Sequence, residues 1–224
     1  MAKVFLSAGH GGSDPGAVSN GLLEKVVNLN ALLACKSELE RHGVTVVASR
    51  TSDVDDPVGE EVNEANRSGA DIAVSFHANA GGGDGFEAYY WDGDSDGLRL
   101  AQLCEKYVKQ LGQNSRGCKS GNHLWFINST EMTSVLVESF FVDNSTDRAI
   151  GDTASEQAAF GVAYAKAILE YLGIAYKSQE QSKPSTPAPS DQLYRVQVGA
   201  FKDKANAEKL MAELKSKGYA AFIK

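Results

Sequence analysis

Cysteine is scarce in this sequence of 224 residues, and its three copies lie far apart. Cys35, Cys104 and Cys118 form no CxxC pair, so no zinc ribbon is indicated. A sparse and odd count is typical of reduced thiols in a protein made in the cytoplasm. Cys35 falls on an apolar helical stripe, which predicts a place in the core.

An excess of positive charge and long apolar runs are also lacking. The formal net charge is −7, which argues against a nucleic-acid partner, because phosphate contacts need a basic surface. No stretch is long or apolar enough to span a membrane. The first residues lack the apolar region and cleavage site of an export signal, so we expect synthesis in the cytoplasm without a signal peptide.

The charge that is present is unevenly distributed. Residues 193–224 contain seven Lys or Arg and three Asp or Glu, a net +4, which leaves −11 for residues 1–192. Residues 176–192 hold three prolines and almost nothing apolar, as expected of a semi-extended linker. The sequence therefore predicts one full-sized domain over residues 1–175, a linker over 176–192 and a small basic unit over 193–224.

Short apolar runs alternate with amphipathic stretches along the larger part. The predicted strands cover residues 3–8, 44–49, 71–76, 86–91, 123–127 and 134–141. The predicted helices run from about residue 24 to Gly43, then over 60–67, 98–111 and 155–172. This alternation predicts an α/β fold whose central, mostly parallel sheet is flanked by helices on both faces.

Four polar residues stand where the ends of these elements meet. His10 follows the first strand, Glu24 begins the first helix, His77 closes the third strand, and Glu138 comes late in the apolar run from residue 135. The carboxyl ends of parallel strands share one edge of a sheet, where ligand crevices form. We therefore expect the four side chains to converge.

Two imidazoles and one carboxylate are a known ligand set for catalytic zinc, with water in the fourth position. Zinc lowers the pKa of that water to about 7, and a second carboxylate then serves as general base and later as general acid. Glu138 suits this second role because an apolar run beside it raises a carboxyl pKa by burial. Taken singly, each residue also has a structural explanation: a turn histidine, or a glutamate that complements a helix dipole.

Five segments, in order along the chain, resemble the motifs of the amidase-3 type N-acetylmuramoyl-L-alanine amidases. They are residues 9–17 (GHGGSDPGA), 20–25 (NGLLEK), 49–53 (SRTSD), 70–79 (ADIAVSFHAN) and 135–141 (VLVESFF). The resemblance covers residues 3 to about 172. It implies that His10, Glu24 and His77 bind one Zn²⁺ and that Glu138 is catalytic. It also implies cleavage of the amide between the lactyl group of N-acetylmuramic acid and L-alanine in peptidoglycan.

The basic unit is similar to one strand–helix–strand repeat of the SPOR family of peptidoglycan-binding domains, whose members usually carry two. A unit of this size without a disulfide or metal is too small to bury a stable core. We therefore expect two chains to share a tail domain in a homodimer. Asn79 in the larger domain, and Arg195 and Gln197 on one face of the tail strand, are candidates for binding substrate.

Two other functions remain open at this stage. A zinc exopeptidase on a similar sheet would need the same ligand set and would differ only in its substrate. A non-enzymatic wall-binding protein would be expected to have lost Glu138 or a ligand, and all four residues are present. With no export signal, the sequence leads us to expect a lytic enzyme that acts on the cell wall after lysis or release, as an endolysin or a sporulation-lysis amidase does.

Overall fold

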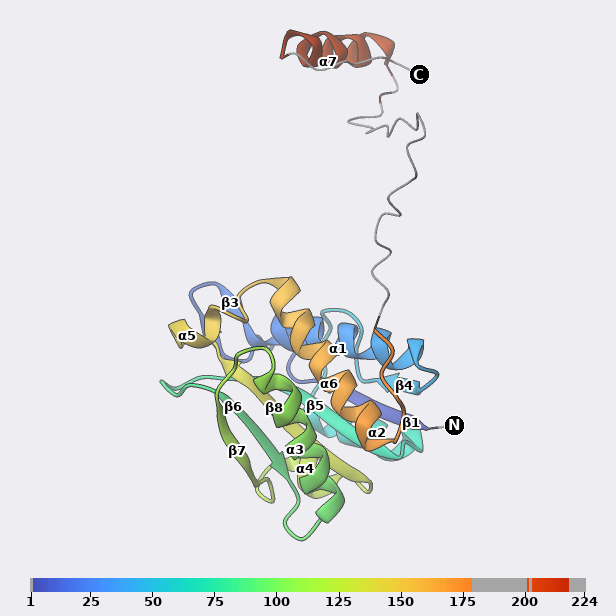
Figure 1. The fold of residues 1–224 in the computed structure, drawn as a ribbon, viewed down its shortest axis with the longest axis vertical. Helices are drawn as coiled ribbons and strands as arrows, with labels where there is room; N and C mark the ends of the chain where they lie inside the picture. The colour runs from blue at the N-terminus through green and yellow to red at the C-terminus, as the bar shows by residue number, and fades with distance from the viewer. Residues whose placement is uncertain (1, 179–200, 202, 218–224) are drawn as a thin grey trace. The chain divides into compact units, whose positions relative to one another are not determined.

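The computed structural model describes residues 2–178, 201 and 203–217 (Figure 1). The chain divides into two compact units, Met1–Ser178 and Gln179–Lys224, which are described separately below. Within the described residues, no helix combines the length and apolar character needed to cross a membrane.

A six-stranded sheet forms the centre of the first unit (Figure 1). In spatial order its strands are β4 (Thr45–Ala48), β1 (Lys3–Ala8), β5 (Ile72–Asn79), β8 (Thr133–Phe141), β6 (Phe86–Tyr90) and β7 (Ser115–Ser120). The pairs β4–β1, β1–β5 and β5–β8 are parallel, whereas β6 runs antiparallel to β8 and parallel to β7. The carboxyl ends of β1, β5 and β8 therefore meet the amino end of β6 at one edge of the sheet.

Helices cover both faces of this sheet, as the sequence predicts. On one face, α1 (Glu24–Arg41), α3 (Ser95–Lys109) and α6 (Ala154–Tyr171) enclose the larger apolar core. On the other face, α2 (Val58–Ser68) and α4 (Trp125–Ser129) cover a smaller core. A hairpin of β2 (Val18–Ser19) and β3 (Leu22–Leu23) precedes α1, and a short helix α5 (Ser145–Arg148) follows β8.

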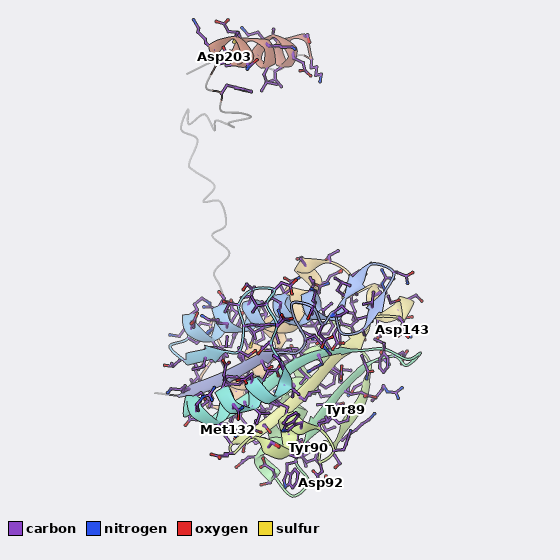
Figure 2. All side chains as sticks on the ribbon, turned by 180° about the vertical axis from the view of Figure 1, so that it is seen from behind. Tyr89, Tyr90, Asp92, Met132, Asp143 and Asp203 are labelled. Atoms are coloured by element: carbon purple, nitrogen blue, oxygen red, sulfur yellow. The ribbon has the colours of Figure 1, made fainter. Side chains whose placement is uncertain are left out.

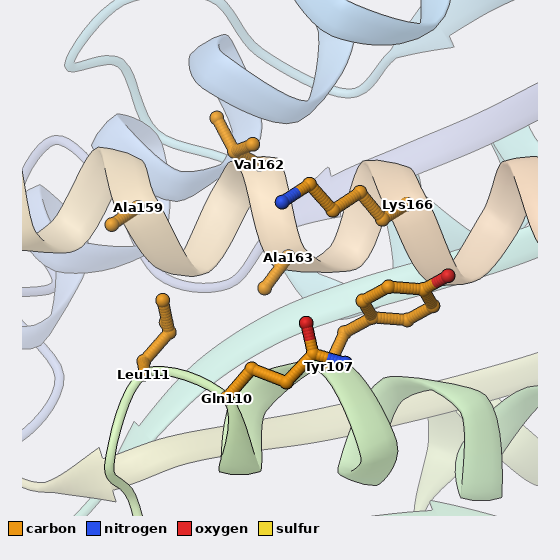
Figure 3. A pocket seen from close by; sticks show the side chains of 7 residues that line it. All are labelled: Tyr107, Gln110, Leu111, Ala159, Val162, Ala163 and Lys166. Atoms are coloured by element: carbon orange, nitrogen blue, oxygen red, sulfur yellow. The ribbon is translucent and has the colours of Figure 1, made fainter. Parts of the chain in front are cut away.

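A glycine allows α1 and α6 to pack closely together. A Cβ atom added to Gly161 of α6 would lie 2.1 Å from the backbone oxygen of Ala31, so only glycine allows this approach. Cys35 of α1 is fully buried in the core between the helices and the sheet, as its place on the apolar stripe predicts. A groove remains between α3 and α6 (Figure 3); its lining residues are Tyr107, Gln110, Leu111, Ala159, Val162, Ala163 and Lys166.

The predicted strand at residues 123–127 is wrong. These residues lead into the helix α4, because a short apolar run fits a buried helix as well as a strand and its packing against α2 decides between them. The sheet instead contains β7, a strand that was not predicted from the sequence. Its residues, SRGCKS, show no apolar alternation, since β7 is an edge strand paired on one side only.

The end of the first unit packs against α1. Tyr176 stacks on the imidazole of His42, with ring centroids 5.1 Å apart, and the backbone N–H of Lys177 donates to His42 Nε2. The other ring nitrogen of His42 lies 2.7 Å from the carbonyl oxygen of Glu38 in the last turns of α1. These contacts explain His42 as a residue that closes the helix end.

In the second unit, the structure describes one helix, α7 (Lys204–Ser216). The side chain of Asp203 caps its amino end by accepting a hydrogen bond from the backbone N–H of Ala205. Leu210, Met211 and Leu214 form an apolar stripe that is half-buried on an otherwise mostly exposed helix. The predicted linker covers residues 176–192; residues 176–178 belong to the first unit, and the rest lies outside the described residues, as does the tail strand with Arg195 and Gln197.

Candidate functional site

The structure brings His10, Glu24 and His77 together. Each offers one ligand atom, a ring nitrogen or a carboxylate oxygen, and these three atoms lie within 4.8 Å of one another. His10 comes from the loop after β1, Glu24 is the first residue of α1, and His77 lies near the end of β5. The cluster therefore forms where the sheet edge meets the amino end of α1, as the order of the elements predicts.

Glu24 is the centre of this cluster. Its Oε1 lies 2.9 Å from His77 Nδ1, and its Oε2 lies 3.2 Å from His10 Nε2. The backbone N–H groups of Ala17 and Ala78 also donate to its carboxylate. Burial works to raise the pKa of Glu24, but the hydrogen bonds from the two histidines outweigh it and hold the pKa far below its usual value. The carboxylate is thus kept ionised and aimed at both imidazoles.

The backbone of His10 has a conformation that few residues other than glycine adopt. Its φ angle is 64°, in the left-handed region that a residue other than glycine occupies only at a cost. Its Nδ1 lies 2.8 Å from the carboxylate of Asp14, which leaves Nε2 to face Glu24. The hydrogen bond with Glu24 raises the pKa of His10 to about 9. Asp14 is thus a positioning residue, a role that its place in the segment GHGGSDPGA does not reveal by itself.

Buried groups behind the loop fix Gly9, against which His77 packs. The carbonyl oxygen of Gly9 accepts from Asn28 Nδ2 at 3.0 Å and from a terminal nitrogen of Arg50 at 3.3 Å. Arg50, 3% exposed, also donates to the carbonyl oxygen of Ala8 at 2.8 Å. A Cβ atom at Gly9 would lie 2.1 Å from Cε1 of His77, so the imidazole rests directly on this glycine.

Glu138 is the neighbour of His77 in the sheet. The two residues are register partners between β5 and β8, which places their Cβ atoms about 5 Å apart on one face. Leu136, two residues earlier, packs in the smaller core, so alternation directs Glu138 to the face of α2 and α4. The groove between α3 and α6 lies on the opposite face.

The carboxyl group of Glu138 has the properties of a proton carrier. Burial raises its pKa to about 7, as the apolar run predicts. Its Oε2 is buried and has no hydrogen-bond partner among the described residues. Such an oxygen is available to a water or a substrate nitrogen that enters between it and the cluster of His10, Glu24 and His77.

A third carboxylate, Glu87 of β6, lies directly across from Glu138 and was missed by the sequence analysis. The two are register partners in the antiparallel β6–β8 pair, so His77, Glu138 and Glu87 form a row across three strands. Glu87 is 3% exposed. A glutamate between Phe86 and Ala88 in a predicted strand is the signal that could have found it, by the same argument that singled out Glu138.

Polar groups surround Glu87 on every side. Its Oε2 accepts from the hydroxyl of Tyr89 at 2.7 Å and from Asn79 Nδ2 at 3.3 Å; Tyr89 is labelled in Figure 2. Its Oε1 accepts from Arg116 and Lys119 of β7. Asn79, a predicted substrate-binding residue, therefore lies beside the site with its amide nitrogen engaged by Glu87.

The donor set of His10, Glu24 and His77 fits zinc. Zinc is held by imidazole nitrogen and carboxylate oxygen, and three protein ligands with one open position are typical of a catalytic site. The hydrogen bond of His10 with Asp14 is the kind of outer contact that orients a ligating imidazole. With Glu138 opposite, the arrangement suits hydrolysis of an amide by an activated water.

Comparisons with known proteins match the chain to two family models. Residues 4–170 match the family described as N-acetylmuramoyl-L-alanine amidase, and residues 163–224 match the SPOR domain, a match that begins inside α6. The chain is 36% identical over 227 residues to the N-acetylmuramoyl-L-alanine amidase CwlM of Bacillus licheniformis, covering 100% of this chain and 85% of that protein. It is 35% identical over 201 residues to the endolysin of Bacillus phage SPP1, covering 83% of this chain and 74% of that protein.

Solved structures show the same fold in this group. The catalytic domain of CwlV, an N-acetylmuramoyl-L-alanine amidase from Bacillus (Paenibacillus) polymyxa var. colistinus, superposes with a TM-score of 0.72 at 32% identity. The match covers 78% of this chain and 100% of that domain. AmiC2 of Nostoc punctiforme matches with a TM-score of 0.72 at 31% identity, over 77% of this chain and 97% of that chain.

Proposed function

Because the chain belongs to the N-acetylmuramoyl-L-alanine amidase family, we propose that it hydrolyses the amide between N-acetylmuramic acid and L-alanine in peptidoglycan. The observation that carries the proposal is the convergence of His10, Glu24 and His77 beside Glu138, whose buried oxygen has no partner among the described residues. The products are a lactyl carboxylate on the sugar and a free amine on the stem peptide.

In this proposal His10, Glu24 and His77 hold a zinc ion. Zinc, when bound, lowers the pKa of water and polarises a carbonyl group, which is the chemistry that amide hydrolysis needs at neutral pH. Asp14 keeps the ring of His10 turned so that Nε2 faces the centre of the cluster. Glu24 remains ionised there because both histidines hydrogen-bond to its carboxylate.

Glu138 moves the proton. Its carboxylate takes a proton from the water that attacks the lactyl carbonyl carbon, and it then donates this proton to the nitrogen of L-alanine as the C–N bond breaks. A pKa raised to about 7 by burial suits a group that must accept and return a proton near neutral pH. The same carboxyl group therefore serves as base and as acid.

We extend the proposal to the second unit, which belongs to the match with the SPOR domain. We propose that it binds peptidoglycan and keeps the enzyme on the wall, with Arg195 and Gln197 as the candidate contacts. The similarity to an endolysin supports a lytic enzyme that reaches the wall on release from a cell.

Replacement of Glu138 by glutamine tests the central claim. Glu138→Gln removes the proton carrier and keeps the size of the side chain, so we expect lysis of purified walls to fall by about 10²- to 10⁴-fold. Zinc content, measured on the purified protein, should stay at one per chain. Glu131→Gln, at an exposed glutamate on the loop before β8, is the matched control and should lyse walls normally.

The products separate this function from other hydrolases. Digested walls should gain free amino groups of L-alanine without new reducing sugar ends, and release of single amino acids would indicate an exopeptidase instead. His77→Ala should lose the metal; unchanged zinc content in that variant would overturn its role as a ligand. Full lytic activity of Glu138→Gln would overturn the mechanism.

A further inference from the structure

Beside the row of His77, Glu138 and Glu87, the sheet carries a pair of cations that the hydrolytic mechanism does not use. The side chains of Arg116 and Lys119 are 45% and 36% exposed, and both donate to the same oxygen of the buried Glu87. Glu87 can neutralise only one of these two cations, and Asp84 is a second acidic group that acts on Arg116 from a distance. These two cations lie beside the candidate site, in a part of the chain that carries a strong excess of negative charge.

Two contacts hold the guanidinium group of Arg116 and leave its two terminal nitrogens unbonded among the described residues. Its Nε donates to Glu87, and its guanidinium carbon lies 5.4 Å from the centre of the Phe141 ring. These contacts use the inner nitrogen and one flat face of the group. Within the part of the chain that the structure describes, the two terminal nitrogens of Arg116 have no hydrogen bond, so they remain available to a ligand. A guanidinium fixed in this way loses little entropy when it binds a carboxylate with two parallel hydrogen bonds.

Arg116 and Lys119 lie close to the place where the substrate amide would be cleaved. Glu87 is directly opposite Glu138 in the sheet, about 5 Å away between Cβ atoms. Arg116 is the second residue of β7, which runs parallel to β6 and therefore begins at the same edge of the sheet. Both cations contact Glu87, so they lie within reach of substrate groups one or two residues from an amide that is cleaved at Glu138.

We propose that Arg116 and Lys119, held by Glu87, bind a carboxylate of the stem peptide and so select substrates. This inference rests on the proposed amidase function. The residue that follows L-alanine in the stem carries either a free α-carboxylate or its amide, and it lies one residue from the cleaved bond. A charged fork recognises the carboxylate form, and it gains no ion pair from the amide form. The enzyme therefore prefers walls whose second stem residue is not amidated.

Steady-state kinetics on two matched muropeptides test the proposal. The two substrates differ only in a carboxylate or a carboxamide on the second stem residue. The wild-type protein should cleave the carboxylate form with a kcat/KM about 10- to 100-fold higher, the range expected for a charge-assisted contact. In Arg116→Gln and in Lys119→Gln this preference should shrink, through a higher KM for the carboxylate form alone.

The kinetic results would differ if Arg116 and Lys119 had only a structural role. If the cations served only to neutralise Glu87, both substrates would lose activity equally and the preference would stay as in the wild type, which would overturn the proposal. Equal cleavage of the two substrates by the wild-type protein would overturn it as well. Lys109→Gln is the matched control, because Lys109 forms a surface ion pair with Glu105 on α3. Cleavage of neither substrate by the wild type would instead refute the amidase function itself.

Discussion

Gly9→Ala offers a severe test of the site, because it disturbs His77 without altering any proposed ligand. Gly9 has no left-handed φ angle, so its backbone accepts alanine. The added Cβ would lie 2.1 Å from Cε1 and 2.2 Å from Nε2 of His77, whereas ordinary contacts begin at 3.4 Å. The imidazole must therefore move by about 1 Å, and a displacement of this size costs roughly 10²-fold in rate.

Two contacts oppose this movement of the His77 ring. His77 Nδ1 lies 2.9 Å from Glu24, and the backbone of the next residue donates to the same carboxylate. Moving the ring stretches the contact that keeps it in line with His10. We expect Gly9→Ala to bind zinc at least about tenfold more weakly, since disturbing the groups that orient a ligand costs about 10- to 100-fold in affinity.

Zinc affinity by competition with a chelator, wall lysis by turbidity and thermal unfolding should be measured on the same preparation. Gly59→Ala is the control, because its Cβ would meet only the exposed ring of Trp125, at 3.3 Å. That variant should keep its zinc and its activity. Gly9→Ala with wild-type zinc affinity, wild-type lysis and an unchanged melting temperature would refute the described packing of His77.

Two further predictions concern the two units separately. Gly161→Ala should destabilise the first unit by about 1–3 kcal/mol, despite the higher helix propensity of alanine, because the methyl group collides with the Ala31 carbonyl; a melting temperature at or above that of the wild type would contradict this. For the second unit, we expect the full chain to sediment as a dimer at micromolar concentration, because the stripe of Leu210, Met211 and Leu214 needs a partner surface. Only monomer in the ultracentrifuge would remove the shared tail domain.

The sequence alone determined the α/β class, most of the strands and helices, and the convergence of His10, Glu24, His77 and Glu138. These features follow from local patterns: apolar periodicity sets the elements, and the alternation of strands and helices brings their ends to one sheet edge. The apolar run before Glu138 was also enough to predict a raised pKa, since burial acts on the carboxyl group from its immediate neighbours.

Only the tertiary structure decided what depends on partners far apart in the chain. Residues 125–127 became part of the helix α4, which packs against α2, and the edge strand β7 carries no apolar pattern that sequence could reveal. Glu87 lies opposite Glu138 because β6 pairs with β8 in an antiparallel direction, which no local motif encodes. The cations that contact Glu87 come from β7. Their position could not be predicted, because pairing between strands is a long-range contact that leaves no trace in the spacing of residues along the chain.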